Sequence, residues 1–202
     1  DAQQNRRVRW SNLVNFYSGN KAWMPKAYEN LKPGVSIFNR FMQLNINSSD
    51  VALTRSEAQS KIWVPDSYRV SQGSLQPLVG AFNSEMPGIT LSAVPTMNAD
   101  TTVAQFSQGI ITSNPQFQQG DAIIFVSFRG VTGAPGTDTG MSPATYTYTE
   151  YVLDTGDTAK MSDKYPAIVA DGTMLQDSAG DGALAAVVIH TRKSGGKLLV
   201  ST

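Results

Sequence analysis

The sequence has no cysteine, one histidine and no long apolar run among its 202 residues. Without cysteine there can be no disulfide, zinc ribbon or thiol nucleophile, and the redox compartment stays open. An apolar stretch of about 18 residues would be needed for a membrane-spanning helix, and none is present. The polar opening at residues 1–5 runs directly into basic residues, which is not the pattern of a signal peptide. These absences exclude disulfide-framework domains, thiol enzymes and membrane-spanning helices.

Charge is scarce and unevenly distributed along the chain. Charged residues make up 16% of the sequence and hydrophobic residues 41%, a balance that favours a folded domain over disorder. Residues 1–61 carry nine Lys or Arg and four Asp or Glu, a net charge of +5. Residues 62–202 carry seven Lys or Arg and twelve Asp or Glu, a net charge of −5. The two parts could therefore attract each other or a neighbouring copy, although an unpartnered surface explains the same asymmetry.

The opening part of the chain predicts helices. Apolar residues at helical spacing predict a helix over residues 2–18, with Trp10 and Phe16 on its core-facing stripe. A second short helix is expected over 24–32, because proline at position 25 is tolerated only in a first turn. A third is expected over 36–45, where a serine can cap the N-terminus. The sequence thus predicts three short helices before the chain changes character.

The rest of the chain predicts an antiparallel β domain. Short apolar or alternating runs recur between turn residues from Ile62 onward, beginning with strands expected at 62–64 and 68–70, and this spacing is typical of sandwiches. The near-continuous apolar run 122–128 predicts a central strand buried on both faces. Residues 194–197, Ser-Gly-Gly-Lys, indicate a hairpin between the last two strands. We therefore predict an α+β fold that is mainly β: a helical segment at 1–60 and a β-sandwich at 61–202 with little helix.

Residues that could carry chemistry are few, and each has a structural explanation. His190 lies in an apolar run, where a half-buried strand residue is the simpler interpretation. The acidic stretch 171–182 departs from the spacing of a calcium loop. Asp-Thr-Gly at 154–156 lacks the second motif that an aspartic protease needs. We predict no enzyme activity, no metal site and no cofactor.

A basic and aromatic group lies near the start of the chain. Its members are Arg6, Arg7, Arg9 and Trp10. Such a group can contact an acidic neighbour or remain a solvated helix face. Nucleic acid is not favoured as its partner, because a nucleic-acid footprint usually gathers more basic charge on one face.

An aromatic strand offers a second candidate surface. Residues 146–151 alternate Tyr and Thr, which we interpret as three tyrosines on one face of a strand. Together with the Gly- and Pro-rich loop at 130–143 they could stack sugar rings. Packing within the sheet explains the same tyrosines.

Four short stretches carry a family resemblance. They are QQNRRVRW at residues 3–10, Phe38-Asn39 with Asn45, VSQGSL at residues 70–75 and GKLLVS at residues 196–201. Through them the chain resembles an uncharacterised family, a domain of unknown function from Bacteroidota and their phages. The resemblance implies a helical front, an Ig-like β-sandwich and no catalytic residue to carry over. Members of that family have a Gly-rich segment before the helices and one more strand after the last, so it also implies an incomplete chain.

Two classes of function compete on this basis. The first is a structural subunit that assembles with copies of itself or with other proteins, in a phage virion or an extracellular surface assembly. A missing last strand would expose a sheet edge from Lys197 to Thr202, and exposed edges invite strand addition. The predicted assembly interface comprises Arg6, Arg7, Arg9, Trp10, Lys197 and Leu199. The alternative is a cell-surface binding module for a glycan or protein ligand.

Overall fold

The structure is a computed structural model that describes residues 2–47, 53–83, 88–91, 96–130, 145–166, 168–171, 174–177 and 183–202. The helices are α1 Ala2–Gly19, the 3-10 turn η1 Met24–Lys26, α2 Ile37–Asn45, α3 Arg55–Gln59, α4 Val103–Ser113 and α5 Met161–Lys164. The strands are β1 Gly80–Asn83, β2 Gly88–Leu91, β3 Ala122–Arg129, β4 Thr145–Val152, β5 Ile168–Asp171, β6 Met174–Asp177, β7 Ala183–Ser194 and β8 Lys197–Val200. Helix and strand are present in comparable amounts, so the fold is α+β.

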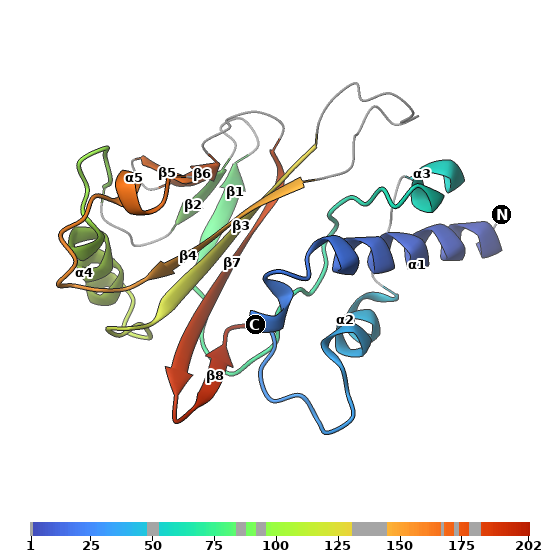
Figure 1. The fold of residues 1–202 in the computed structure, drawn as a ribbon, viewed down its shortest axis with the longest axis horizontal. Coiled ribbons are helices and arrows are strands. Elements are labelled where there is room, and N and C mark those ends of the chain that lie inside the picture. The colour runs from blue at the N-terminus through green and yellow to red at the C-terminus, as the bar shows by residue number, and fades with distance from the viewer. Residues whose placement is uncertain are drawn as a thin grey trace.

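The strands form two antiparallel sheets of four strands each, ordered β1-β2-β6-β5 and β4-β3-β7-β8. In Figure 1, helices α1 to α3 lie on one side of the β4-β3-β7-β8 sheet, and α4, α5 and the other sheet lie on the opposite side. We call these the helical face and the α4 face of the sheet. The predicted boundary at residue 60 stays a prediction, and residues from both sides of it share one apolar cluster.

Strand β3 is the central strand that the apolar run predicted. It pairs with β4 on one side and with β7 on the other. Successive side chains of a strand point to opposite faces. Accordingly Ile124 and Phe128 join the cluster on the helical face, and Ile123 and Phe125 join the cluster on the α4 face. This strand therefore belongs to both halves of the core.

The β7–β8 hairpin also forms as predicted. Gly195 and Gly196 have φ values of 55° and 77°, in the left-handed region. Two consecutive residues of that kind form the turn that best matches the twist of the flanking strands.

The helical segment agrees with the prediction in part. Helix α2 begins after Ser36, whose hydroxyl accepts from the Asn39 amide at 3.1 Å. The expected helix over 24–32 is wrong beyond its first turn, which is η1. Past that turn Tyr28 forms a parallel bridge with Gln72, so the backbone is extended and cannot continue as a helix.

The predicted strands at 62–64 and 68–70 are wrong, although the chain there is extended. Asparagine side chains of the helices take the place of a neighbouring strand. The Asn12 side chain accepts from the Val64 amide at 2.9 Å and donates to its carbonyl at 3.0 Å. Likewise, the Asn45 side chain accepts from the Arg69 amide at 2.7 Å and donates to the Arg69 carbonyl at 3.0 Å. Each asparagine amide satisfies both backbone groups of one residue, so no sheet partner is required.

The chain as a whole is not mainly β as predicted, because helix and strand are present in comparable amounts, and residues 62–202 contain a long helix that was not expected, α4. Its N-cap Thr102 and Gln105 form a capping box, with bonds of 3.2 and 2.9 Å between side chain and backbone. The residues Val103, Phe106 and Ile110 are buried in the cluster on the α4 face. Helix α4 therefore covers part of the sheet that a sandwich would cover with strands.

Candidate functional site

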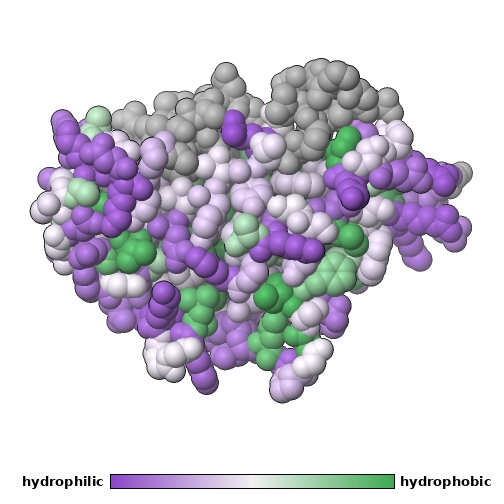
Figure 2. Space-filling view, in the orientation of Figure 1, coloured by the Kyte–Doolittle hydropathy of each residue, from purple (hydrophilic) through white to green (hydrophobic). Residues whose placement is uncertain are grey.

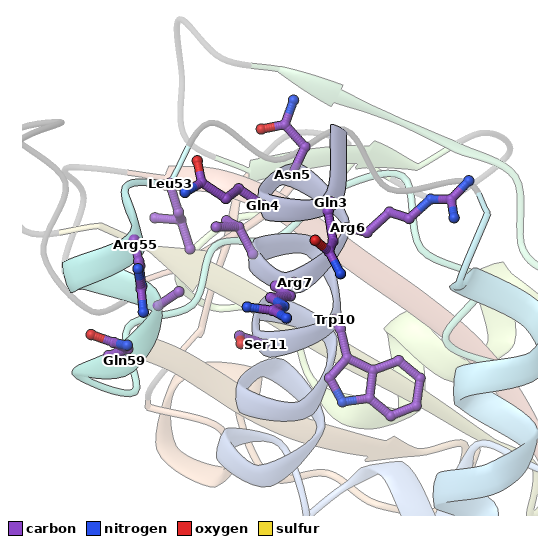
Figure 3. Close-up of a pocket in the computed structure, with 12 residues that line it drawn as sticks. Gln3, Gln4, Asn5, Arg6, Arg7, Trp10, Ser11, Leu53, Arg55 and Gln59 are labelled. Carbon is purple, nitrogen blue, oxygen red and sulfur yellow. The ribbon is translucent and has the colours of Figure 1, made fainter. Parts of the chain in front are cut away.

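A groove between α1 and α3 brings together several of the predicted interface residues (Figure 3). Its volume is about 690 Å³. Its lining comes from Gln3, Gln4, Asn5, Arg6, Arg7, Val8, Trp10 and Ser11 of α1, from Leu53, and from Arg55, Ala58 and Gln59 of α3. Three arginines, four side-chain amides and one indole thus surround a small apolar floor.

The local fold explains how this groove is held open. Val8 packs against the small cluster that contains Leu53. Helix α3 starts with a capping box in which the Glu57 carboxylate accepts from the Thr54 amide at 2.8 Å. The exposed side of α1 then lies beside the first turn of α3. Asn15 donates to the Ala58 carbonyl at 3.0 Å and fixes the two helices together.

The groove is basic, because three of its lining residues are arginines. Arg6, Arg7 and Arg55 make no ion pair within the part of the chain that the structure describes. Figure 3 shows Arg7 on the α3 side of α1, and Arg6 and Trp10 on the other side. Trp10 is 49% exposed, so it does not join the core stripe that its spacing predicted. Figure 2 shows hydrophilic side chains gathered over this end of the molecule, at the right.

The structure brings together some of the predicted interface residues and separates others. Arg6, Arg7 and Trp10 line the groove, whereas Arg9 does not and has a partner of its own. Lys197 and Leu199 lie on β8, near the C-terminal end of α1, while the groove lies at its N-terminal end (Figure 1). Their role in an interface stays a prediction. Sequence reasoning missed Arg55, because only the packing of α3 on α1 places it there.

The edge of β8 is not open where it was expected to be. The Val200 amide donates to the Glu29 carboxylate at 3.0 Å, and the Leu75 amide donates to the Val200 carbonyl at 2.9 Å. The Thr202 hydroxyl donates to the Gly73 carbonyl at 2.9 Å. A Cβ on Gly73 would lie 2.0 Å from the Val200 carbonyl oxygen, so only glycine permits this approach. Segment 72–75 therefore closes the end of this edge.

Glu29 joins three segments that are far apart in the sequence: its own, the one at Ser74 and the one at Val200. Burial raises the pKa of its carboxyl, but hydrogen bonds from the Val200 and Ser74 amides outweigh burial and lower the pKa overall. The Ser74 hydroxyl donates to the same carboxylate at 2.9 Å.

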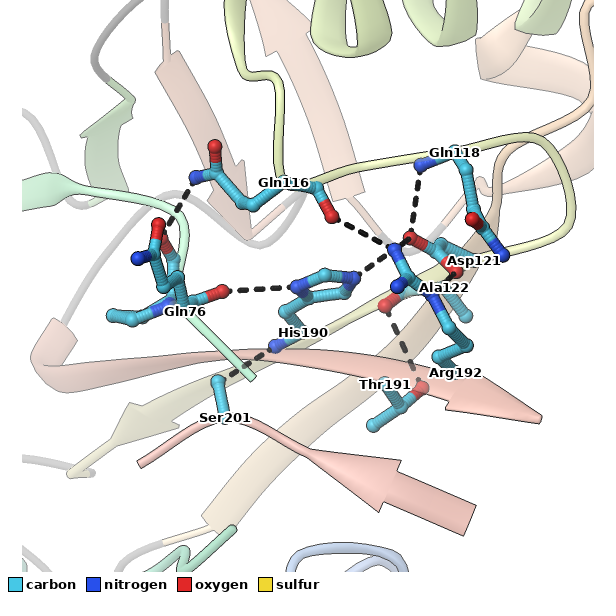
Figure 4. Close-up of polar contacts among 10 residues, drawn as sticks. Gln76, Gln116, Gln118, Asp121, Ala122, His190, Thr191, Arg192 and Ser201 are labelled. Carbon is cyan, nitrogen blue, oxygen red and sulfur yellow. Dashed lines mark hydrogen bonds and ion pairs between the residues drawn. The ribbon is translucent and has the colours of Figure 1, made fainter. Parts of the chain in front are cut away.

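His190 belongs to a buried ionic cluster (Figure 4). The side chains of His190 and Asp121 have no exposed area, so the half-buried histidine that was predicted is fully enclosed. Arg192 binds both carboxylate oxygens of Asp121, at 2.7 and 2.6 Å. The His190 Nε2 lies 2.8 Å from the same carboxylate, and Nδ1 lies 2.9 Å from the Gln76 carbonyl. Both ring nitrogens therefore face oxygen atoms of the protein.

Hydrogen bonds and ring stacking hold the members of this cluster in place. Desolvation raises the pKa of Asp121, yet hydrogen bonds from Arg192, His190 and the Gln118 amide together lower it. The Phe117 ring stacks on His190 with centroids 3.8 Å apart and closes one side. Positions 190 and 192 are two residues apart, so their side chains share one face of β7. This spacing was the feature of the sequence that could have indicated that Arg192 lies beside His190.

The tyrosines of β4 do not form a single platform. Tyr146 and Tyr148 pack at the helical face, while Tyr151 is 1% exposed in the cluster on the α4 face. The predicted three-tyrosine face is wrong, because position 151 has the opposite parity to 146 and 148. The loop at 131–143 lies outside the described residues.

No metal site appears among the described residues, where no group of three or more His, Asp or Glu side chains comes together. The Asp154 carboxylate accepts from the Gly156 amide and from the Gln119 side chain, both at 2.9 Å, which makes it part of a turn. Of the acidic stretch 171–182, residues 172–173 and 178–182 lie outside the described part.

Comparison with known proteins adds no relative. No protein-family model, curated protein or solved structure matches this chain. The resemblance to the Bacteroidota and phage family therefore stays a prediction. No helix in the described part of the chain has the length and apolar character needed to cross a bilayer.

Proposed function

We propose that this protein is a non-enzymatic structural subunit that assembles through the basic groove between α1 and α3. Its partners are copies of itself or other structural subunits, in a phage virion or an extracellular surface assembly. The observation that carries the proposal is a set of arginines that form no ion pair with any described residue, Arg6, Arg7 and Arg55, beside the half-exposed Trp10. Arginine and tryptophan are enriched at protein interfaces, and unpaired cations attract acidic segments.

The occupant of the groove is an acidic protein segment. The chain outside residues 1–61 carries a net charge of −5, so a second copy supplies a complementary surface. Three arginines in a groove of about 690 Å³ are few for a nucleic-acid footprint, which supports a protein partner over nucleic acid.

The finer description of the fold is also a proposal: an Ig-like β-sandwich. Two antiparallel four-stranded sheets and the cluster that joins Leu175 of β6 to Phe125 of β3 support it. The family resemblance implies the same architecture.

The groove is tested with the double variant Arg6→Glu/Arg7→Glu. We expect sedimentation to show association of the unmodified protein at low salt and its weakening at high salt, because exposed charges are screened over about 8 Å at physiological ionic strength. The double variant should not associate. The control Lys21→Glu/Lys32→Glu makes the same charge change at exposed positions away from the groove and should behave like the unmodified protein.

A second measurement uses poly-L-glutamate as a model acidic chain. Trp10 is half exposed, whereas Trp23 and Trp63 are buried, so a change in tryptophan fluorescence on titration reports mainly on the groove. A salt-insensitive monomer that does not respond to poly-L-glutamate would contradict the proposal. It would favour the alternative, a cell-surface binding module for a glycan or protein ligand.

A further inference from the structure

The two edges of the β4-β3-β7-β8 sheet are treated differently. Strand β8 is short, and Glu29 and segment 72–75 occupy the outward backbone groups of Val200. Strand β4 spans eight residues at the other edge. Within the described ranges, only the Tyr165 hydroxyl bonds to an outward backbone group of this edge, and a sheet edge with free backbone groups can pair with another chain.

The direction of the free backbone groups follows from the ladder. Residues of an edge strand alternate between bonding the neighbouring strand and pointing both backbone groups outward. The Val152 amide donates to the Tyr165 hydroxyl at 3.3 Å, away from β3. The β3–β4 register is unbroken from Val152 to Thr145, so Glu150, Tyr148 and Tyr146 also point outward. Among the described residues no backbone group bonds to these three.

The usual devices that block an edge are missing from this strand. It has no proline, no lysine and no bulge between Thr145 and Val152. Its one charge, Glu150, is paired with Lys26, which also donates to the Tyr148 hydroxyl at 3.1 Å. The Tyr148 hydroxyl donates to Glu150 at 2.8 Å. The edge therefore has no bulge, and its one charge is paired.

The sequence of the edge is complementary to itself. In an antiparallel pair of two β4 strands centred on Tyr148, each Tyr148 faces its own copy, and each Glu150 faces Tyr146 of the other strand. The two Glu150 side chains then lie four residues apart along the pair, about 13 Å. No like charges meet, and all three outward residues of each strand exchange hydrogen bonds.

We propose that β4 pairs antiparallel with β4 of a second copy, in a register centred on Tyr148. The pairing joins two four-stranded sheets into one continuous sheet across a two-fold axis. This inference deepens the proposed assembly function but uses a surface other than the basic groove, so the two can fail separately.

The absence of cysteine makes a direct test available, because one introduced cysteine can form a disulfide only between copies. Facing residues of a hydrogen-bonded antiparallel pair have Cα atoms about 5.5 Å apart, within the range of a disulfide. The Tyr148→Cys variant should therefore form a covalent dimer under mild oxidation. The Glu150→Cys variant alone should not, whereas a mixture of Tyr146→Cys and Glu150→Cys proteins should form the mixed dimer.

A matched pair of variants tests the outward amide itself. Both variants remove the tyrosine side chain. Tyr148→Pro also removes the outward N–H, whereas Tyr148→Ala keeps that N–H. Proline is tolerated where an edge N–H faces solvent, and thermal melts check that both variants fold. Sedimentation should give a dimer dissociation constant at least about tenfold higher for the proline variant than for the alanine variant, because two symmetric hydrogen bonds are lost.

Two results would overturn the proposal. One is a monomer at every concentration in sedimentation together with no cross-linking of Tyr148→Cys. The other is equal cross-linking of Tyr148→Cys and Glu150→Cys alone, which indicates random collision or another occupant of the edge. Loss of association in the Arg6→Glu/Arg7→Glu protein, with Tyr148→Cys still not cross-linking, would remove the edge pairing and leave the groove function standing.

Discussion

The two faces of the β4-β3-β7-β8 sheet are covered and fastened in different ways. On the helical face the Phe128 ring meets Trp63 and Phe16, with centroids 6.0 and 5.6 Å away. On the α4 face Phe125 lies in a cluster with residues of α4 and β6. On the helical face, asparagine side chains bond α1 and α2 to segment 62–70, whereas the α4 side includes a buried ionic cluster. One strand, β3, supplies both faces, so damage to either is transmitted to the other.

The largest loss of stability is expected when a buried ring is removed from either face of the sheet. Phe125→Ala and Phe128→Ala each remove a fully buried ring from β3, on opposite faces. We expect each to lower the free energy of unfolding by about 3–5 kcal/mol in urea titrations. A loss below about 1 kcal/mol for Phe128→Ala alone would show that the helical layer unfolds separately from the sheet.

The ionic cluster gives the next effect and a pH signature. Asp121→Asn leaves His190 and Arg192 without their carboxylate, and we expect a loss of about 3 kcal/mol near neutral pH. The pKa of Asp121 is lowered in the folded protein, so its contribution is present above the unfolded pKa and is lost as pH falls through the folded value. The stability gap between variant and parent should therefore shrink below about pH 4. Asp163→Asn, at an exposed position, serves as the control and should change little.

The smallest loss of stability is expected when the asparagine bonds between the helices and segment 62–70 are removed. Asn12→Ala leaves the amide and carbonyl of Val64 without partners in a buried setting. We expect a loss of about 1–3 kcal/mol by the same denaturation assay. The control Asn5→Ala removes an exposed asparagine from the same helix and should cost less than about 0.5 kcal/mol. Equal losses in the two variants would mean that the Asn12 bonds do not fasten segment 62–70.

Features set by local sequence were predictable. Helix α2 follows from a serine cap, β3 from an apolar run, and the β7–β8 turn from two glycines. Helix α4 carried the same kind of signal, since Thr102 and Gln105 have capping-box spacing and Val103, Phe106 and Ile110 share one helix face. It was missed because short apolar runs on both sides favoured a β interpretation of the whole region.

Features set by distant partners were not predictable in the same way. An extended segment bonded to asparagine side chains has the same local pattern as a strand in a sheet. The groove needed Arg55 from α3, and the segments at Gly73 and Glu29 occupy the end of the β8 edge that was expected to be exposed. Both outcomes depend on which segments meet in space.

The hydrogen bonds of Glu29 affect how the chain folds during synthesis. Its carboxylate receives the Val200 amide, which lies 171 residues further along the chain. Contacts of such long separation form late, because a large loop must close first. During synthesis the early helices emerge well before the sheet that covers their apolar side, and the bond to Glu29 cannot form until Val200 has been made. The nascent helical segment is therefore the stage at which a chaperone has the most to bind.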